Sequence, residues 1–383
     1  PIGAQASDIN IEEIDTYVRK TSSSKKQKLS SKSFSNDLAN LKQKVNRSEV
    51  DYNKFEAGSF SDTTILDGKV IMGLGGISGV TDLSSSLKDH LTFNTVYQMN
   101  LNTSFTGDDN LYIRLKGGEW SDEWKQKGST YHIEAKDTAD SSGNIDFKVD
   151  KIWYSFPITD SITATVGPKI ENYYMLAATP SVYQPGALKA FKLGGHGAAF
   201  GASTSTGAGL KYQADNGFAS SITLNSSGAA SSTKGLLTDE DSNKINTMVA
   251  YTADQYHVSA TYSKQTGGWK AWEYFATTDA AASAGDDSDS YAFRAWWRPQ
   301  ETGTAIPSVS AGYDIINFSG HTLAEEATGY MVGLNWQDTF QPNDRIGLAM
   351  GSVLSISEHV AGVEDNVEVD PMLWELYYSF RPN

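Results

Sequence analysis

The sequence predicts an all-β fold, namely a transmembrane antiparallel β-barrel preceded by an N-terminal helix. Three observations support this class. One segment of fifteen residues alternates with a period of two, fourteen strand-like segments follow one another, and the spacers between them alternate in length. Fourteen strands are visible, and we expect sixteen in the full-length protein.

The longest alternating segment runs from Leu91 to Phe105, and side chains in a strand point to opposite faces in turn. One face carries the apolar and threonine residues Leu91, Phe93, Thr95, Tyr97, Met99, Leu101, Thr103 and Phe105. The other carries the mostly amide-bearing set Thr92, Asn94, Val96, Gln98, Asn100, Asn102 and Ser104. A strand that crosses a membrane needs roughly 9–11 residues, so this segment is long enough to meet lipid on one face and water on the other.

The same alternation recurs along the chain. Strands are predicted at 62–73, 89–105, 110–117, 144–156, 161–169, 207–214, 217–226, 245–253, 255–264, 289–299, 305–316, 328–337, 343–355 and 371–381. Their spacers are predicted to alternate long and short without exception, as in barrels with short periplasmic turns and long external loops. Aromatic residues near strand ends are expected to form the interfacial girdle: Trp153, Tyr154, Trp296, Trp297, Trp336 and Trp374.

Composition and charge narrow the classes of function. The chain has 383 residues, no cysteine and a net charge of -15, with -16 carried by residues 63–383 and +1 by residues 1–62. A region this negatively charged repels the phosphate backbone of nucleic acids, which argues against nucleic-acid binding. No apolar run approaches the roughly 18 residues of a membrane helix. The acidic residues gather in clusters that are typical of solvated loops.

The N-terminal region divides into three predicted parts. Residues 1–6 end in a small-x-small signal at Ala4-Gln5-Ala6 and are interpreted as the remnant of a signal peptide. Residues 7–33 include a Ser/Lys-rich stretch and are predicted to be a flexible linker. Residues 34–57 are predicted to form a periplasmic helix or short coiled coil, the alternative being an amphipathic helix packed on its own barrel. Its apolar ladder is Phe34, Leu38, Leu41, Val45, Ser48, Tyr52 and Phe55.

The longest spacer, 170–206, is a candidate for a loop that folds inward and narrows the channel. It contains two neighbouring tyrosines, Tyr173 and Tyr174, and the basic residues Lys189, Lys192 and His196. The alternatives are an external loop or a longer sixth strand.

Several segments, taken in order, carry a resemblance to a known family. They are 36–42, 60–64, 66–70, 101–107, 111–115, 153–157, 207–212, 306–313 and 333–336. Over about residues 36–383 the chain resembles the cyanobacterial outer-membrane porins, often called iron-uptake porins, which are related to OprB-like carbohydrate porins. The resemblance implies a channel of sixteen strands in the outer membrane.

Two departures from that family pattern stand out. Many members carry an S-layer-homology domain that binds the cell wall, and nothing of that kind lies between Ser7 and the predicted helix. The chain also stops at Arg381-Pro382-Asn383 instead of a strand with a terminal aromatic residue. We therefore expect the sequence to be cut at both ends, lacking the start of the signal peptide and one C-terminal hairpin of the barrel domain, 62–383.

Catalytic and metal motifs are missing from the sequence. The histidines are scattered without an HExxH motif, there is no P-loop, and the glycines after Ile71 lack Rossmann spacing. We therefore expect no enzyme, no cofactor and no metal site.

The sequence thus predicts a passive porin for small hydrophilic solutes and inorganic ions, with carbohydrate or iron uptake as family labels. The expected partners are outer-membrane lipid, two further copies in a homotrimer, and peptidoglycan through residues 7–57. Alternatives are a secreted soluble β-protein, such as a lectin or polysaccharide hydrolase, and a structural envelope tether. Candidate pore-lining residues, inferred from the alternation, are Asn94, Gln98, Asn100, Arg114, Lys116, Asp146, Lys148 and Asp150, with Lys189 and Lys192 from the long spacer.

Overall fold

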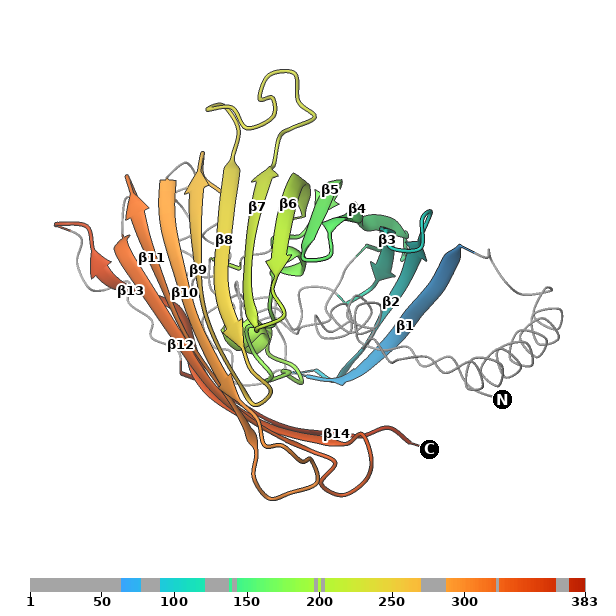
Figure 1. Cartoon of the computed structure of the whole chain (residues 1–383). Helices are drawn as coiled ribbons and strands as arrows, with labels where there is room; N and C mark the ends of the chain where they lie inside the picture. Colours follow the sequence, from blue (N-terminus) through green and yellow to red (C-terminus); the bar gives the residue numbers. More distant parts are fainter. Residues whose placement is uncertain are drawn as a thin grey trace, which may run out of the picture.

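The structure is a computed structural model that describes residues 63–76, 90–120, 138–139, 143–195, 199–200, 204–269, 287–321, 324–362 and 372–382. The described residues form one 14-stranded sheet in which every strand pairs with its neighbour in chain order. All of these pairings are antiparallel, and the sheet curves around an interior (Figure 1). The all-β class expected from the sequence is confirmed, as one antiparallel sheet.

The strands are β1 (Thr64–Gly75), β2 (Thr92–Thr103), β3 (Asn110–Gly118), β4 (Lys148–Thr159), β5 (Ile162–Ile170), β6 (Ser205–Gln213), β7 (Phe218–Ser226), β8 (Asn243–Thr252), β9 (Tyr256–Thr266), β10 (Asp287–Trp297), β11 (Ser308–Ser319), β12 (Ala324–Gln337), β13 (Arg345–His359) and β14 (Met372–Ser379). Each of the fourteen predicted strands is present, with its ends moved by a few residues. Two short 3-10 helices, η3 (Asn172–Met175) and η4 (Lys189–Gly194), lie between β5 and β6.

The alternation of long and short connections holds along most of the sheet but is wrong at one place. The connection between β10 and β11, at 298–307, is longer than the connection between β11 and β12, at 320–323. The cause is that β11 lies three residues later than predicted, at 308–319 instead of 305–316, while β10 ends at Trp297 and β12 already begins at Ala324. The sequence pattern therefore placed both ends of β11 too early and the start of β12 too late.

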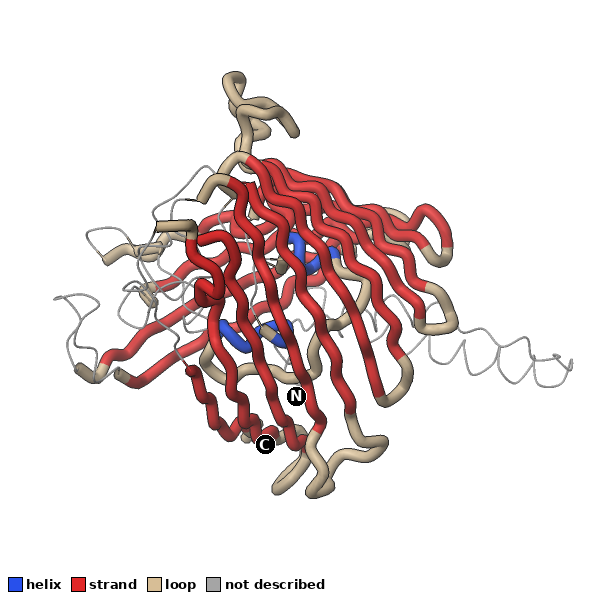
Figure 2. Tube along the Cα trace, turned by 90° about the vertical axis from the view of Figure 1, so that its left-hand side faces the viewer, coloured by secondary structure: helices blue, strands red, loops and turns tan. Residues whose placement is uncertain are grey.

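The two faces of the sheet differ in chemistry, as the period of two requires. On β7, β8 and β9, Ile222, Val249 and Val258 point outward and are 42 to 51% exposed. On the inner face of the same strands, Thr223, Asn246, Met248 and His257 are 2% exposed or less. The outward apolar belt continues around the sheet through Leu210, Ile245, Phe293, Val332 and Leu376. Figure 2 shows the strands running side by side, and their pairing in chain order places these exposed residues on neighbouring strands.

Aromatic residues edge this belt near the short turns. Tyr212 and Phe218 flank the β6–β7 turn with ring centroids 6.2 Å apart, and Tyr251 and Tyr256 flank the β8–β9 turn at 6.1 Å. The part of β9 from Tyr256 to Lys264 is about 26 Å long. At a strand tilt of about 40° this length corresponds to about 20 Å along the axis of the sheet. The belt is therefore close to the height of an apolar band of about 25 Å.

Two of the predicted girdle residues lie inside instead. Trp153 and Trp296 are both 5% exposed on the inner face. The ring of Trp296 stacks on His257, with centroids 5.5 Å apart. Trp153 faces inward because the β3–β4 pairing shifts register between Arg114 and Leu115, which moves the following β4 residues to the other face.

The edges of the sheet are β1 and β14 (Figure 1), and no pairing joins them among the described residues. In the part of the chain that the structure describes, no helix has the length and hydropathy of a membrane span. The predictions for residues 1–6, 7–33 and 34–57 fall outside the described residues.

Candidate functional site

The connection between β5 and β6 crosses the inner face of the sheet. We call its described residues, 171–195, 199–200 and 204, the inner segment. Most of these residues are buried, although they form a connection with little regular structure. A buried connection needs partners for its backbone groups, and here the inward side chains of the wall supply them. The sequence alone does not decide between this inward position, an external loop and a longer sixth strand.

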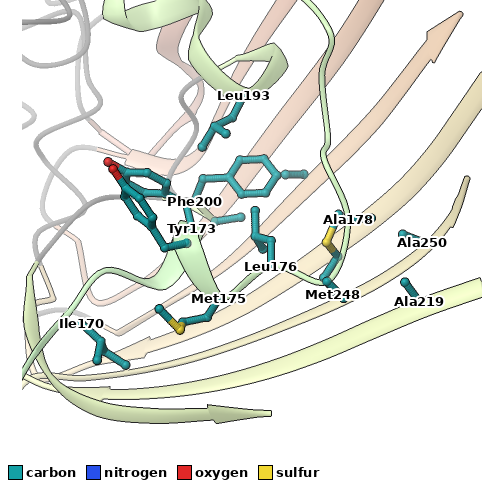
Figure 3. Packing of buried hydrophobic residues seen from close by; sticks show 14 of the residues in the cluster. Ile170, Tyr173, Met175, Leu176, Ala178, Leu193, Phe200, Ala219, Met248 and Ala250 are labelled. Carbon is teal, nitrogen blue, oxygen red and sulfur yellow. The ribbon is translucent and has the colours of Figure 1, made fainter. Parts of the chain in front are cut away.

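The inner segment is anchored first on β6 and β7. The backbone N–H of Ala177 donates to Ser221 Oγ at 3.2 Å, and Gln213 Nε2 donates to the Ala177 carbonyl at 2.8 Å. Beside these bonds an apolar cluster joins Met175 and Leu176 to Met248 on the wall (Figure 3). Burying such side chains stabilises the packed segment by about 1.5–3 kcal/mol each.

A second anchor lies on β14. The Glu375 carboxylate accepts hydrogen bonds from the backbone N–H groups of Ala187 at 2.6 Å and Leu188 at 2.8 Å. Its other oxygen accepts from the Tyr183 hydroxyl at 2.8 Å. Next to it, the Tyr377 hydroxyl donates to the carbonyl of Gln184. One inward carboxylate therefore holds the middle of the segment against the last described strand.

A third anchor lies on β10 and β11. Arg294 is 3% exposed and pairs with Asp314 through one terminal nitrogen, at 2.7 and 2.8 Å to the two carboxylate oxygens. The same guanidinium donates to the carbonyls of Leu193 at 2.8 Å and Gly195 at 2.7 Å. Leu193 has a positive φ of 61°, so the chain turns sharply where the guanidinium binds it.

The wall of β3 and β4 and the start of the inner segment share a cluster of aromatic and charged residues. Tyr112 stacks on Trp153 at 4.4 Å between centroids, and Tyr174 lies 5.3 Å from Trp153. Arg114 donates to the Tyr174 hydroxyl at 3.1 Å and pairs with Asp150.

The basic residues around this cluster come from both the wall and the inner segment. Lys151 pairs with Glu171 at the start of the segment. Lys192 donates to the Tyr173 hydroxyl at 3.1 Å, with its ammonium 4.4 Å from that ring centroid. Each basic group therefore lies beside an aromatic ring or a carboxylate.

The predicted pore-lining residues fall into three groups. Asn94, Gln98 and Asn100 lie on the inner face of β2 and are 8% exposed or less. Asn100 donates to Asp67 at 2.5 Å and accepts from Tyr112 at 3.0 Å, so it belongs to a hydrogen-bonded network across β1 to β3.

The second group is Arg114, Lys116, Asp150 and Lys148 on β3 and β4, which the register brings together. Asp146 lies just before β4 and is exposed. The third group, Lys189 and Lys192, lies on η4 and is half-buried.

Sequence reasoning missed several inward residues of the site. Lys151 was missed because the register shift reverses the alternation that pointed to Asp146, Lys148 and Asp150. Arg294 and Glu375 alternate with outward residues in their strands. The alternation could therefore have predicted that both side chains point inward. Their partners lie about 100 and 190 residues away along the chain, and alternation carries no information on such contacts.

Carboxylates also order the short turns at one end of the sheet. Asp109 accepts from Ser104, Thr106 and Tyr154, and Asp344 accepts from the backbone N–H groups of Thr339, Phe340 and Gln341. Desolvation raises the pKa of each carboxyl, but these hydrogen bonds outweigh it and hold both pKa values below the ordinary range.

Comparisons with known proteins give few relatives. No known family model matches the chain. An uncharacterized protein of Synechocystis sp. (strain ATCC 27184 / PCC 6803 / Kazusa) is 29% identical over 146 residues, which cover 38% of this chain and 26% of that protein. The chain thus spans about a quarter of the length of this relative.

Several solved structures share a similar arrangement of strands. Salmonella typhi OmpF in complex with daunomycin has a TM-score of 0.48 at 13% identity, over 84% of this chain and 86% of that chain. Pseudomonas putida OprB at high pH has 0.45 at 11%, over 79% and 76%. The outer-membrane channel DcaP of Acinetobacter baumannii has 0.43 at 11%, over 82% and 97%.

Proposed function

We propose that this chain is an outer-membrane porin, a passive channel for small hydrophilic solutes and inorganic ions. One observation carries the proposal: most large apolar side chains of the sheet face outward and are exposed, while most polar side chains of the strands face inward. A soluble sandwich would bury those apolar side chains against a second sheet. A large exposed apolar surface indicates contact with another apolar phase, and in a β-sheet of this height that phase is lipid.

The inner segment supports a channel over an enzyme. Its three anchors hold a strip of chain across the interior, where it narrows any passage along the sheet axis. Among the described residues, no group of three or more histidine, aspartate or glutamate side chains is arranged to hold a metal ion. The polar groups of the inner face act in this proposal by lining water, and Asn94, Gln98, Asn100, Arg114 and Lys116 are proposed to line it.

The orientation and assembly follow the rules for such barrels. The end that carries the Asp109 and Asp344 turns is proposed to face the periplasm, with the N-terminal segment on the same side. We further propose a homotrimer and a contact between residues 7–57 and peptidoglycan. Comparing unheated and heated protein in gel electrophoresis tests the trimer, and a peptidoglycan pull-down with and without residues 7–57 tests the contact.

Thiol labelling in a planar bilayer tests the channel directly, because the chain has no native cysteine. Lys211 is half-buried on the inner face of β6, and its neighbour Leu210 is 45% exposed on the outer face. A bulky water-soluble thiol reagent is expected to lower the conductance of Lys211→Cys and to leave that of Leu210→Cys unchanged. A protein that stays monodisperse without detergent and conducts no ions would contradict the proposal.

The class of solute needs its own measurement. The family resemblance names carbohydrate and iron uptake, and swelling of liposomes that contain the protein in sugars of increasing size measures the first. Uptake of ferric ion into the same liposomes measures the second. Swelling that is no faster than in empty liposomes for the smallest sugar would remove carbohydrates from the proposal.

A further inference from the structure

Two exposed leucines lie at the tip of the β7–β8 loop, residues 227–242, which rises beyond the ends of the strands (Figure 1). Leu236 is 58% exposed and Leu237 is 47% exposed. Leu237 also has a positive φ of 57°, a backbone conformation that bulky residues rarely adopt and that concentrates at functional sites. Adjacent apolar side chains held in water in this way indicate a surface that another molecule covers.

The loop is well ordered below these leucines. Asp241 is 1% exposed, and its carboxylate accepts hydrogen bonds from the backbone N–H groups of Gly228 at 2.7 Å and Ser242 at 2.8 Å. Nearer the tip, the N–H of Gly235 donates to the carbonyl of Ser231 at 2.9 Å. The two leucines are therefore presented by a structured loop, which lowers the entropy lost when they bind.

Acidic residues accompany the leucines. Asp239 and Glu240 follow them directly and are exposed. We call Leu236, Leu237, Asp239 and Glu240 the loop tip. A surface that complements the loop tip must be apolar and must carry a basic group at its edge.

The outer face of β4 and β5 has both of these properties at the end of the long loops. Phe147, Val149 and Val166 are 42 to 50% exposed there. Lys169 lies opposite the outward residue Ile152, so it shares this face, and its ammonium donates to the carbonyl of Val149 at 2.8 Å. Among the described residues, no carboxylate pairs with Lys169. We call Phe147, Val149, Val166 and Lys169 the outer patch.

The loop tip and the outer patch belong to the same level of the wall. Val166 lies opposite Ala208 on β6, and Ala208 lies opposite Leu224 on β7. The loop begins directly after Ser226, at the same end of β7. Copies that stand in one membrane have parallel axes, so features at one level of neighbouring copies can meet.

We propose that the loop tip of one copy docks on the outer patch of the next copy in the membrane. This inference rests on the proposed outer-membrane assembly, for which it names the contact. Two different surfaces of the chain meet in it, so the contact is heterologous and closes a ring when it is repeated around an axis. In such a contact the leucines serve as apolar anchors, while the acidic residues and Lys169 fix the register.

The loop tip supplements a larger contact between the walls. Stable interfaces bury about 800 Å² on each partner, more than four loop residues provide. The loop tip is therefore expected to set the stability and the register of the assembled ring, and the conductance of each copy is expected to persist without it.

Cysteine cross-linking of the full chain in liposomes tests the contact, because the native chain has no cysteine. The pair Leu236→Cys and Val166→Cys is expected to give covalent oligomers on a heated, non-reducing gel after oxidation. The matched control pairs Leu236→Cys with Val249→Cys, which is 49% exposed on the outer face of β8. The control pair and each single variant are expected to give several-fold fewer covalent oligomers.

Charge reversal tests the complementarity by a second route. Lys169→Glu is expected to lower by several degrees the temperature at which the assembled ring dissociates in gel electrophoresis. Adding Asp239→Lys and Glu240→Lys to Lys169→Glu is expected to restore that temperature, since the charges attract again.

The outcomes separate this inference from the channel. Absent cross-links in the test pair, or equal cross-linking in the control pair, overturn the contact between the loop tip and the outer patch. Failure of the combined charge reversal to restore the dissociation temperature overturns the part assigned to Lys169. Conductance in a planar bilayer is measured separately, and a protein that inserts and carries no current overturns the channel function even where the cross-links form.

Discussion

The anchor at Glu375 gives the most quantitative prediction. Truncation by Glu375→Ala removes the acceptor for the N–H groups of Ala187 and Leu188 and for the Tyr183 hydroxyl. A hydrogen bond to a charged group contributes about 1.5–3 kcal/mol. The three bonds share one carboxylate, so their contributions are not additive. We therefore expect the free energy that docks the inner segment onto the sheet to fall by the equivalent of one to two bonds, about 3 kcal/mol.

Hydrogen exchange measures that loss at the affected amides. Because a factor of ten corresponds to about 1.4 kcal/mol, the exchange of the Ala187 and Leu188 amides is expected to accelerate about a hundredfold in Glu375→Ala. Glu375→Gln keeps a neutral acceptor, and charge-assisted bonds are roughly twice as strong as neutral ones, so an acceleration of about tenfold is expected. The control is Glu325→Ala, at an exposed glutamate of β12.

The graded series makes this prediction easy to refute. Exchange at both amides within about twofold of wild type in Glu375→Ala would mean that the carboxylate does not hold the segment. An equal acceleration in Glu325→Ala would mean that the effect arises from general destabilisation of the wall and not from the anchor.

Three further predictions concern the rest of the interior and the turns. Arg294→Ala leaves Asp314 buried without its guanidinium and is expected to lower the free energy of unfolding by about 3–5 kcal/mol, measured by denaturant titration, whereas a loss below about 1 kcal/mol would contradict a buried ion pair. Gly312→Ala places a methyl group onto the carbonyl oxygen of Gly194, so limited proteolysis is expected to cleave the inner segment faster, and an unchanged cleavage rate would argue against this close approach. Asp344 has a lowered pKa, so its stabilisation is present above the unfolded value of about 3.9 and is lost as the pH falls through the folded value. The difference in melting temperature between wild type and Asp344→Asn should therefore be present at neutral pH and shrink in acid, and a difference independent of pH would refute it.

The number of strands and the face of most side chains could be predicted from the sequence, because both follow from local alternation. Residues 91–105 show this well, since Asn94, Gln98 and Asn100 lie on the inner face as the period of two requires. The alternation no longer predicts the face of a side chain where one strand has an extra residue in its pairing with the next strand. The register shift beside Arg114 turned Lys151 inward, and no local feature of the sequence marks that shift.

The docking of the inner segment could not be predicted for a different reason. Its anchors join Glu375 and Arg294 to backbone groups far away in the chain, and any inward polar residue of the wall could have served as well. Trp153 and Trp296 show the same limit, because a tryptophan near a strand end suits a membrane interface and a packed interior equally well. Only the paired register and the packing of the segment separate the two.

The central claim is that outward side chains of the sheet meet lipid and inward ones meet a polar interior. Spin labels attached to single cysteines along β9 test it most directly, since the native chain has no cysteine to interfere. In reconstituted bilayers, labels at Val258, Ala260 and Tyr262 are expected to be more accessible to oxygen than to a water-soluble nickel complex. Labels at Ser259 and Thr261 are expected to show the opposite preference or little access to oxygen. Accessibility without this period of two, or outward labels as accessible to nickel as those on a loop, would contradict the account.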